Sequence, residues 1–290
     1  MITLTSCPAC GQSAFKNYLT CKDYTVSKNH FSLVQCSTCT LLATSPRPKD
    51  EDLGLYYEST EYISHTSKAN NLVNTLYLIA RSFTLTQKRK LAQRLVPQKG
   101  SLLDVGCGTG DFLQSCLQDN WNCTGIEPGK QPREIAASKG INTFEELSQV
   151  KEKYQLITLW HVLEHVPDLN QTLANLYDLL DDKGALLIAV PNHLSYDAIT
   201  YKEDWAGYDV PRHLWHFNQQ SMERILQNNH FKLQEILPMK LDAYYVSLLS
   251  EAYKGTGILR YAKAFINGLV SNLSARNNKQ YSSLIYIFKK

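Results

Sequence analysis

The 290-residue chain has no apolar run long enough to span a membrane and no strong excess of one charge. Its longest apolar runs, such as residues 185–190, fall well short of the about 20 residues that a membrane helix needs. The start Met1-Ile2-Thr3-Leu4 lacks a basic segment followed by an apolar one, so we expect no signal peptide and a cytoplasmic location. We therefore expect a protein that does not insert into membranes.

The sequence also lacks a dense Lys/Arg stripe, internal repeats and low-complexity segments. A net charge of +3 is too small to indicate a nucleic-acid partner by itself, so a small-molecule partner is expected. With 43% hydrophobic and 20% charged residues, the composition is that of a globular protein. Its length allows one large core and an accessory module.

The most informative segment is a glycine-rich turn between an apolar run and a helix. It reads Asp104-Val105-Gly106-Cys107-Gly108-Thr109-Gly110, and Phe112 follows in the helix. Glycines allow the backbone to approach a ligand closely, and the helix start offers unpaired N–H groups. Dinucleotide sites need G-x-G-x-x-G to seat a pyrophosphate, whereas here the glycines alternate and follow an acid. A cationic, phosphate-free ligand is therefore favoured.

This run closely resembles motif I of the class I S-adenosylmethionine-dependent methyltransferases. The resemblance implies S-adenosylmethionine as cofactor, with S-adenosylhomocysteine as product. Glu127 follows the next expected strand, 121–126, where an acid reaches ribose hydroxyls. Glu145 or Glu146 matches the family's acid near the adenine, and Trp160 and His161 border the cofactor. The implied cofactor residues are Asp104, Gly106, Cys107, Gly108, Gly110, Phe112, Glu127, Pro128, Glu145, Trp160 and His161.

The resemblance also implies an α/β fold with a Rossmann-like, seven-stranded sheet, in which strand 7 runs antiparallel between strands 5 and 6. The pattern predicts helices over 111–120, from Asp168 to a stop at Gly184, and over 221–230. It predicts strands over 185–190, 232–237 and 283–288. Amphipathic helices over 242–276 could cap the substrate pocket or form a homodimer contact.

Cys107 within the turn could be mistaken for a nucleophile. The family has varied small residues at this position that contribute backbone, so a packing role is favoured. Three further cysteines are expected as buried thiols: Cys21, Cys116 and Cys123.

Near the N-terminus lie two C-x2-C pairs, Cys7/Cys10 and Cys36/Cys39. Each pair places two thiolates on one tight turn, and together they match the four-sulfur tetrahedral site that zinc favours. Four protein ligands close the coordination shell, so the zinc should be structural. The alternative, reduced cysteines that merely pack, does not account for two matched pairs.

The region after this zinc-ribbon-like module resembles a bacterial methyltransferase subgroup that includes deoxysugar C-methyltransferases. A Pro-rich turn predicts a boundary near residue 48. Residues 49–98 should form a helical linker or lid, with a helix over 70–96, and residues 99–290 the methyltransferase domain. Tyr56, Tyr57 and Tyr62 could anchor this segment or cover the ligand.

Five of the eight histidines fall where the strand ends should converge: His161, His165, His193, His213 and His216. His161-x-x-Glu164-His165 has the letters of an inverted zinc-protease motif, but that motif needs a continuous helix and Pro167 disfavours one. Some methyltransferases carry Glu-x-x-Glu-His here and bind a divalent metal, which stays open for this chain. Otherwise Glu164 and His165 orient the turn or face the substrate.

The segment 205–218 resembles the active-site loop of the same subgroup, in which a histidine is proposed as the base. His213 is the best match, and His161 and His165 are further catalytic candidates. The alternative is that the aromatic and histidine side chains pack the loop on the core. Transfer to an oxygen or carbon of a small molecule, such as a sugar nucleotide, is expected. An RNA methyltransferase and a non-catalytic scaffold protein are the alternatives.

Overall fold

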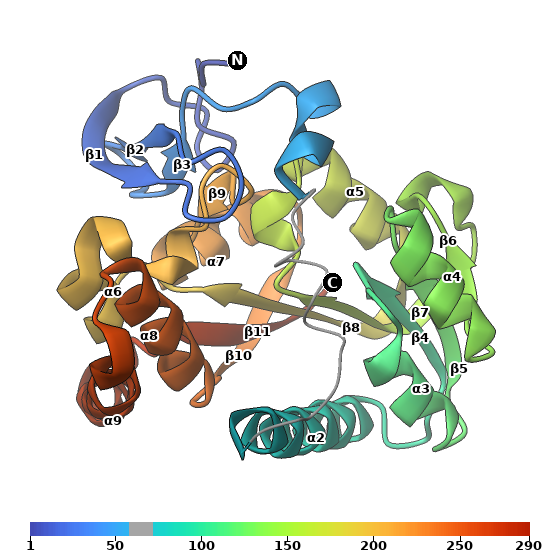
Figure 1. The fold of residues 1–290 in the computed structure, drawn as a ribbon. Helices are drawn as coiled ribbons and strands as arrows, with labels where there is room; N and C mark the ends of the chain where they lie inside the picture. The colour runs from blue at the N-terminus through green and yellow to red at the C-terminus, as the bar shows by residue number, and fades with distance from the viewer. Residues whose placement is uncertain (58–71) are drawn as a thin grey trace.

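A computed structural model describes residues 1–57 and 72–290, with side chains from residue 82 onward in the second range. Its main element is a seven-stranded sheet in the order β10-β11-β8-β7-β4-β5-β6 (Figure 1). The strands are β4 (Ser101–Val105), β5 (Asn122–Ile126), β6 (Asn142–Phe144), β7 (Tyr154–Trp160), β8 (Leu180–Pro191), β10 (Lys232–Pro238) and β11 (Ser283–Lys289).

The sheet has the topology that the sequence predicts. β4, β5, β6, β7 and β8 pair in parallel, whereas β11 runs antiparallel between β8 and β10. The central strands are short apolar runs because both faces of the sheet are covered. The predicted seven-stranded fold with one inserted antiparallel strand is confirmed.

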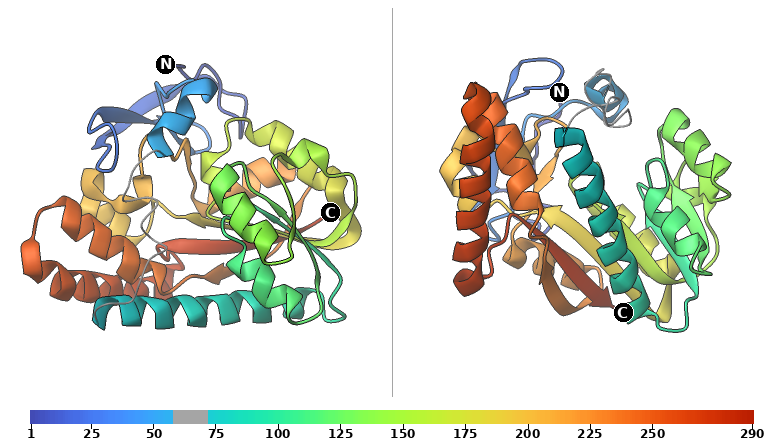
Figure 2. Two further views of the ribbon diagram at one scale, coloured as in Figure 1. Left: turned by 45° about the vertical axis from the view of Figure 1, so that its right-hand side comes forward. Right: turned by 60° about the horizontal axis from the view of Figure 1, so that its bottom comes forward.

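Helices cover both faces of the sheet. On one face α2 (Leu72–Leu95), α3 (Asp111–Leu117) and α4 (Lys130–Ser138) share a core with Leu102, Leu156 and Leu187. On the other, α5 (Leu169–Leu179) and α7 (Gln219–Asn228) pack on Leu103, Ile157 and other strand residues. Figure 2 shows α2 running along one side of the sheet. This layering leaves the carboxyl ends of β4, β5, β7 and β8 at one edge.

The predicted end of one helix at Gly184 is wrong. α5 begins after Asp168, whose side chain accepts a hydrogen bond from the Gln171 N–H at 3.0 Å, as predicted. The helix ends at Leu179, and β8 starts at once because Leu180 is buried and pairs with Tyr154 of β7. Gly184 therefore lies within a strand.

The N-terminal residues form a smaller antiparallel sheet of β1 (Phe15–Lys22), β2 (His30–Cys36) and β3 (Leu42–Thr44). Its fourth strand, β9 (Trp215–His216), comes from the predicted active-site loop and pairs with β3. The cores are continuous too, because Cys7, Leu41 and Ala43 belong to the same buried cluster as the α5 and α7 residues. The 48/49 boundary therefore divides the chain in sequence only. In space, β9 from the C-terminal part completes the sheet of the N-terminal part.

A helical pair, α8 (Asp242–Tyr253) and α9 (Arg260–Asn278), lies between β10 and β11 in sequence, as the pattern over 242–276 predicts. The pair packs on α6 (Tyr196–Tyr201). Within the described ranges, no helix has the length and apolar character needed to cross a bilayer.

Candidate functional site

The glycine turn joins β4 to α3 with three glycines in the left-handed region. Gly106, Gly108 and Gly110 have φ of +72°, +54° and +75°. A Cβ on Gly106 would lie 2.4 Å from a Val162 methyl, and one on Gly110 would lie 2.5 Å from the Ile141 methyl. At Gly108 the space is open. Two glycines thus let the turn pack, and Gly108 leaves room above it for a ligand.

Glu127 holds this turn at the end of β5. Its carboxylate accepts the Gly108 N–H at 2.8 Å and the Gly129 N–H at 2.9 Å. A carboxylate has about four acceptor positions, so ribose hydroxyls can still donate to it. The sequence predicted the ribose contact, and the structure adds the link between Glu127 and the turn.

Asp104 and Cys107 both face inward. Thr158 donates its hydroxyl to the buried Asp104 carboxylate at 2.6 Å, and burial raises the pKa of Asp104 to about 7. Burial raises the pKa of the Cys107 thiol to about 12, beside Asp104 and Glu127. The thiolate is therefore scarce at neutral pH, which agrees with a packing role for Cys107.

The adenine end of the expected site lies near β6. Arg133 donates to the Glu127 and Pro128 carbonyls at 2.6 and 2.8 Å and to the Glu145 carboxylate at 2.8 Å. Glu146 instead caps the short turn 147–149 together with Gln149. Arg133 thus ties Glu145, rather than Glu146, to the Glu127 loop.

Trp160 ends β7 and borders a cavity of about 560 Å³. Its ring meets Phe112 edge-on at 5.7 Å between centroids, and the Lys88 ammonium lies 4.2 Å from its ring centre. The cavity lies between α2 and the segment 237–242 and is mostly apolar, with Leu91, Leu237, Met239 and Ile285 among its lining. A ligand with an apolar portion would fit beside Trp160.

His161 is held in an unusual backbone conformation, with φ of +57°. Its Nε2 lies 3.1 Å from the Asp242 carboxylate and its Nδ1 lies 3.5 Å from that of Glu164. Burial lowers the pKa of His161, but the two carboxylates outweigh it and raise this pKa to about 9. The two carboxylates therefore favour the charged imidazole at neutral pH, which disfavours His161 as the acceptor of a substrate proton.

Besides the four N-terminal cysteines, one more group could hold a metal ion in the part of the chain that the structure describes. It consists of Glu164, His165 and His213, whose potential ligand atoms lie within 4.8 Å of one another. The Glu164 carboxylate is buried, and neither oxygen receives a hydrogen bond from any residue that the structure describes. Burial, together with the neighbouring His213, lowers the pKa of His165 to about 4. His213 thus takes the place beside Glu164 and His165 that the sequence pattern assigned to His161.

The ring nitrogens of the two histidines have defined roles. The His213 Nδ1 lies 2.9 Å from the Gly207 carbonyl oxygen, which can only accept, so Nδ1 carries the proton. The His165 Nδ1 lies 3.0 Å from the Arg212 carbonyl oxygen and 2.9 Å from the Tyr57 hydroxyl. In neutral imidazoles, both Nε2 atoms then carry lone pairs.

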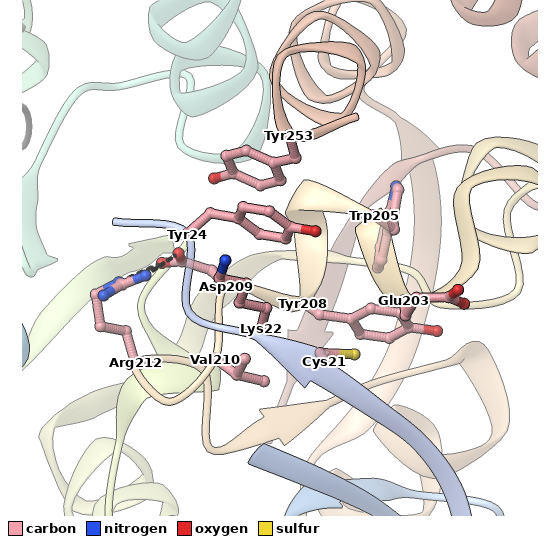
Figure 3. A pocket seen from close by; sticks show the side chains of 10 residues that line it. All are labelled: Cys21, Lys22, Tyr24, Glu203, Trp205, Tyr208, Asp209, Val210, Arg212 and Tyr253. Carbon is pink, nitrogen blue, oxygen red and sulfur yellow. Dashed lines mark hydrogen bonds and ion pairs between the residues drawn. The ribbon is translucent and has the colours of Figure 1, made fainter. Parts of the chain in front are cut away.

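The loop that carries His213 is fastened to the N-terminal module. Arg212 is buried and donates to Asp209 at 2.5 and 2.9 Å (Figure 3). It also donates to Asp23 of the module at 3.3 Å. In the same view Tyr24 stacks on Tyr253 of α8, with ring centroids 4.2 Å apart. The module therefore fixes the loop that positions His213.

The two remaining histidines of the predicted cluster have structural partners. The His216 Nε2 lies 3.1 Å from the Thr44 hydroxyl, and the His193 Nε2 lies 3.2 Å from the Asn218 amide nitrogen. Burial lowers the pKa of both rings, that of His193 to about 4. They pack the loop on the core.

Three site residues were not predicted from the sequence: Lys88, Tyr57 as a partner of His165, and Asp242 as a partner of His161. Lys88 lies in a helix that was predicted from the spacing of its apolar residues, which says nothing about its polar side chains. Asp242 lies 81 residues after His161, so no local pattern connects the two. Tyr57 was expected only to anchor its segment or to cover the ligand. Tyr62 and the other residues 58–71 of the expected linker or lid over 49–98 lie outside the described residues.

The four N-terminal cysteines come together as predicted. The Cys7 and Cys39 sulfurs are 3.4 Å apart, those of Cys10 and Cys36 are 3.5 Å apart, and all four lie within 4.8 Å of one another. About 3.8 Å separates two sulfurs of a tetrahedral site with Zn–S bonds near 2.3 Å. The donor set and spacing thus fit a zinc ion. The expected burial of Cys21, Cys116 and Cys123 is confirmed.

Comparison with known proteins identifies the fold and the family. A family model described as a methyltransferase domain matches residues 80–236, more than half of the chain. The ubiquinone biosynthesis O-methyltransferases of Saccharophagus degradans and Aeromonas salmonicida are 34% and 30% identical over 102 residues. That match covers 31% of this chain and 43% of each relative, so this chain aligns with less than half of their length.

Among solved structures, magnesium protoporphyrin IX methyltransferase from Synechocystis PCC 6803 with bound S-adenosylhomocysteine has a TM-score of 0.55. The two chains are 15% identical, and the match covers 81% of this chain and 97% of the other. At that identity the likeness establishes the shared fold. Together with the glycine turn and the sheet order, these matches show that the chain belongs to the methyltransferase-domain family, with the class I S-adenosylmethionine-dependent fold.

Proposed function

We propose that this protein transfers a methyl group from S-adenosylmethionine to an oxygen or carbon atom of a small molecule. The observation that carries the proposal is the Glu127 carboxylate bound to the Gly108 N–H, which joins an acid for the ribose to the turn beneath it. Asp104 adds support, because a buried carboxyl with a raised pKa is stabilised as the anion by a cationic ligand. S-adenosylmethionine supplies such a cation.

In the proposed reaction the acceptor atom attacks the methyl carbon in line with the departing sulfur. The protein contributes mainly orientation, which can supply about 7–11 kcal/mol of the barrier. His213 receives the acceptor's proton at Nε2, while its Nδ1 stays bound to Gly207. Arg212, held by Asp23 and Asp209, keeps this imidazole in place.

The acceptor is proposed to have an apolar portion that enters the cavity beside Trp160. The lining by Leu91, Leu237, Met239 and Ile285 supports this choice. The two ubiquinone-pathway relatives are named for O-methylation. A sugar nucleotide stays within the proposal only if its apolar face, rather than its phosphates, lies in this cavity. We propose that the Cys7, Cys10, Cys36 and Cys39 cluster holds a structural zinc.

His213 has a competing role as a ligand of a divalent cation in the cluster of Glu164, His165 and His213. The buried Glu164 carboxylate pairs with the His161 imidazole at 3.5 Å and accepts no hydrogen bond within the described residues, so it could also bind such an ion. His165 and His213 would be the other protein ligands. The ion would polarise an acceptor hydroxyl. In that case His213 is a ligand instead of a base, and activity lost after chelator treatment is restored by Mg²⁺ alone, which a four-cysteine site does not bind.

Calorimetric titration with S-adenosylmethionine and S-adenosylhomocysteine tests the proposal. We expect wild-type protein to bind both, and Glu127→Ala to bind each at least tenfold more weakly. Glu134→Ala, which removes an exposed carboxylate on α4, is the matched control and should bind normally. Absence of binding by the wild-type protein would refute the enzyme function and leave a scaffold role.

A further inference from the structure

The helical pair α8 and α9 presents an unpartnered apolar face. In the right-hand view of Figure 2, α9 lies at the outer edge of the molecule with α8 inside it. Only small residues of α9 are buried, namely Ala264, Gly268, Ser271 and Ala275. A Cβ on Gly268 would lie 2.6 Å from Tyr244, so this side of the helix is pressed closely against α8.

The large apolar residues of this segment point the other way. The side chains of Ile258, Leu259, Phe265 and Ile266 are 80%, 61%, 61% and 58% exposed. On α9, Leu269 and Leu273 follow Phe265 and Ile266 at the three- and four-residue spacing of one helix face. Ile258 and Leu259 lie in the short 3-10 turn just before the helix. We call these six residues the α9 stripe. Exposing six large apolar side chains in one band is unfavourable in water, which indicates that something covers them.

The charged residues of the segment that carries the stripe are all basic. From residue 254 to residue 279 the sequence has no Asp or Glu and five basic residues, Lys254, Arg260, Lys263, Arg276 and Lys279. The Arg260 guanidinium sits 4.9 Å from the Tyr261 ring centre. An apolar band flanked by cations and aromatic rings is typical of helices that lie in the surface of a bilayer.

We propose that the α9 stripe docks on an anionic lipid bilayer, with α9 lying in the headgroup region and not crossing the membrane. The apolar side chains would enter the acyl boundary, and the five cations would contact lipid phosphates. A second copy of this chain is a poorer occupant, because two such faces would bring ten cations together without an acidic partner on either.

One end of the α9 stripe lies near the cavity beside Trp160. Asn272, next to Leu273, donates its amide to the Lys240 carbonyl at 2.9 Å, and Lys240 and Leu241 line the cavity beside Trp160. Docking would thus bring a membrane-dissolved acceptor close to the proposed methyl donor. This consequence rests on the proposed function, whereas vesicle binding itself does not.

The test is sedimentation of the full chain with vesicles, in the absence of S-adenosylmethionine. We expect binding to phosphatidylglycerol/phosphatidylcholine vesicles, weak binding to phosphatidylcholine alone, and release as salt rises. The double variant Phe265→Ser, Ile266→Ser should bind anionic vesicles at least tenfold more weakly. Leu55→Ser, at a position 58% exposed but distant in sequence, is the matched control and should bind as the wild type does.

Two results would overturn the proposal. One is that wild-type protein does not sediment with anionic vesicles, or that the double variant sediments equally well. The other is a dimer in analytical ultracentrifugation that the double variant loses, without vesicle binding, which would make the stripe a contact between copies. Circular dichroism confirms that the variant is folded, and a cofactor titration reports separately on the proposed function.

Discussion

His213 and Gly207 are joined by a hydrogen bond in which the imidazole Nδ1–H donates to the carbonyl oxygen over 2.9 Å. Because the carbonyl fixes the proton on Nδ1, the Nε2 atom of the neutral ring has a free lone pair. The ring is buried, and its edge meets the ring of His165 with centroids 4.6 Å apart. An imidazole with a fixed tautomer is thus in place, as the proposed role of His213 as the base requires.

Replacing His213 by Ala should lower turnover by about 10²–10⁴, the usual contribution of a positioned base. Affinity for S-adenosylmethionine should stay unchanged, since none of the glycine-turn contacts involve His213. Release of S-adenosylhomocysteine measures turnover, and calorimetry measures affinity. His30→Ala, at an exposed position of the N-terminal sheet, is the control. Normal turnover in the His213 variant would remove this residue as the base.

His161 should make stability depend on pH through Asp242. The pKa of His161 is raised from 6.5 to about 9 in the folded chain, so its protonated form stabilises the fold. This contribution is complete below pH 6.5 and is lost as the pH rises through about 9. Asp242→Asn removes one of the two carboxylates responsible.

The imidazole is 34% exposed, so solvent reduces the loss in Asp242→Asn to about 1 kcal/mol, or about 2–4 °C in Tm. Thermal unfolding at pH 6 and at pH 10 measures it. The difference between wild type and variant should be present at pH 6 and nearly absent at pH 10. An equal difference at both values would show that Asp242 acts through packing alone.

Gly110→Ala should destabilise the fold by about 1–3 kcal/mol. The added methyl would lie 2.9 Å from the Ala136 Cβ, at a φ of +75°. Gly54→Ala is the matched control, because nothing lies within 4 Å of its Cβ and its φ is not positive, so a change within about 0.5 kcal/mol is expected. Urea unfolding compares the two. Equal stabilities would show that the turn tolerates a side chain at residue 110.

Cys39→Ser should remove zinc and lower the Tm. Metal analysis of the wild type should give about one zinc per chain, and a chelator that strips it should lower the Tm similarly. Cys107→Ser keeps all four ligands and should retain the zinc. A metal-free wild-type protein with an unchanged Tm would make the four cysteines a packing cluster only.

The sequence predicted the parts of this protein that depend on local patterns. Three features each depend on backbone geometry within a few residues. They are the alternating glycines after Asp104, the acid after the next strand and the two C-x2-C pairs. The inserted antiparallel strand followed from the family resemblance. These features placed the sheet order and the cysteine cluster correctly.

What the sequence did not predict depends on contacts between distant segments. The pairing of Glu164 with His213 arises because the loop after β8 folds back over β7, which no local spacing encodes. The prediction of a helix that continues to Gly184 failed because the pairing of Leu180 with β7 ends the helix at Leu179, before the glycine. The apolar residues of α9 were expected to cap a pocket or a dimer, and their exposure appears only in three dimensions.

The pairing of β3 with β9 limits how the chain can be divided. A shortened protein that begins at residue 49 would leave β9 as an exposed edge and would bury Arg212 without Asp23. Loss of one partner of a buried ion pair costs about 3–5 kcal/mol, in the very loop that carries His213. Removing or exchanging the cysteine module should therefore loosen the loop that carries His213, so the proposed base depends on a module that lies far from it in sequence.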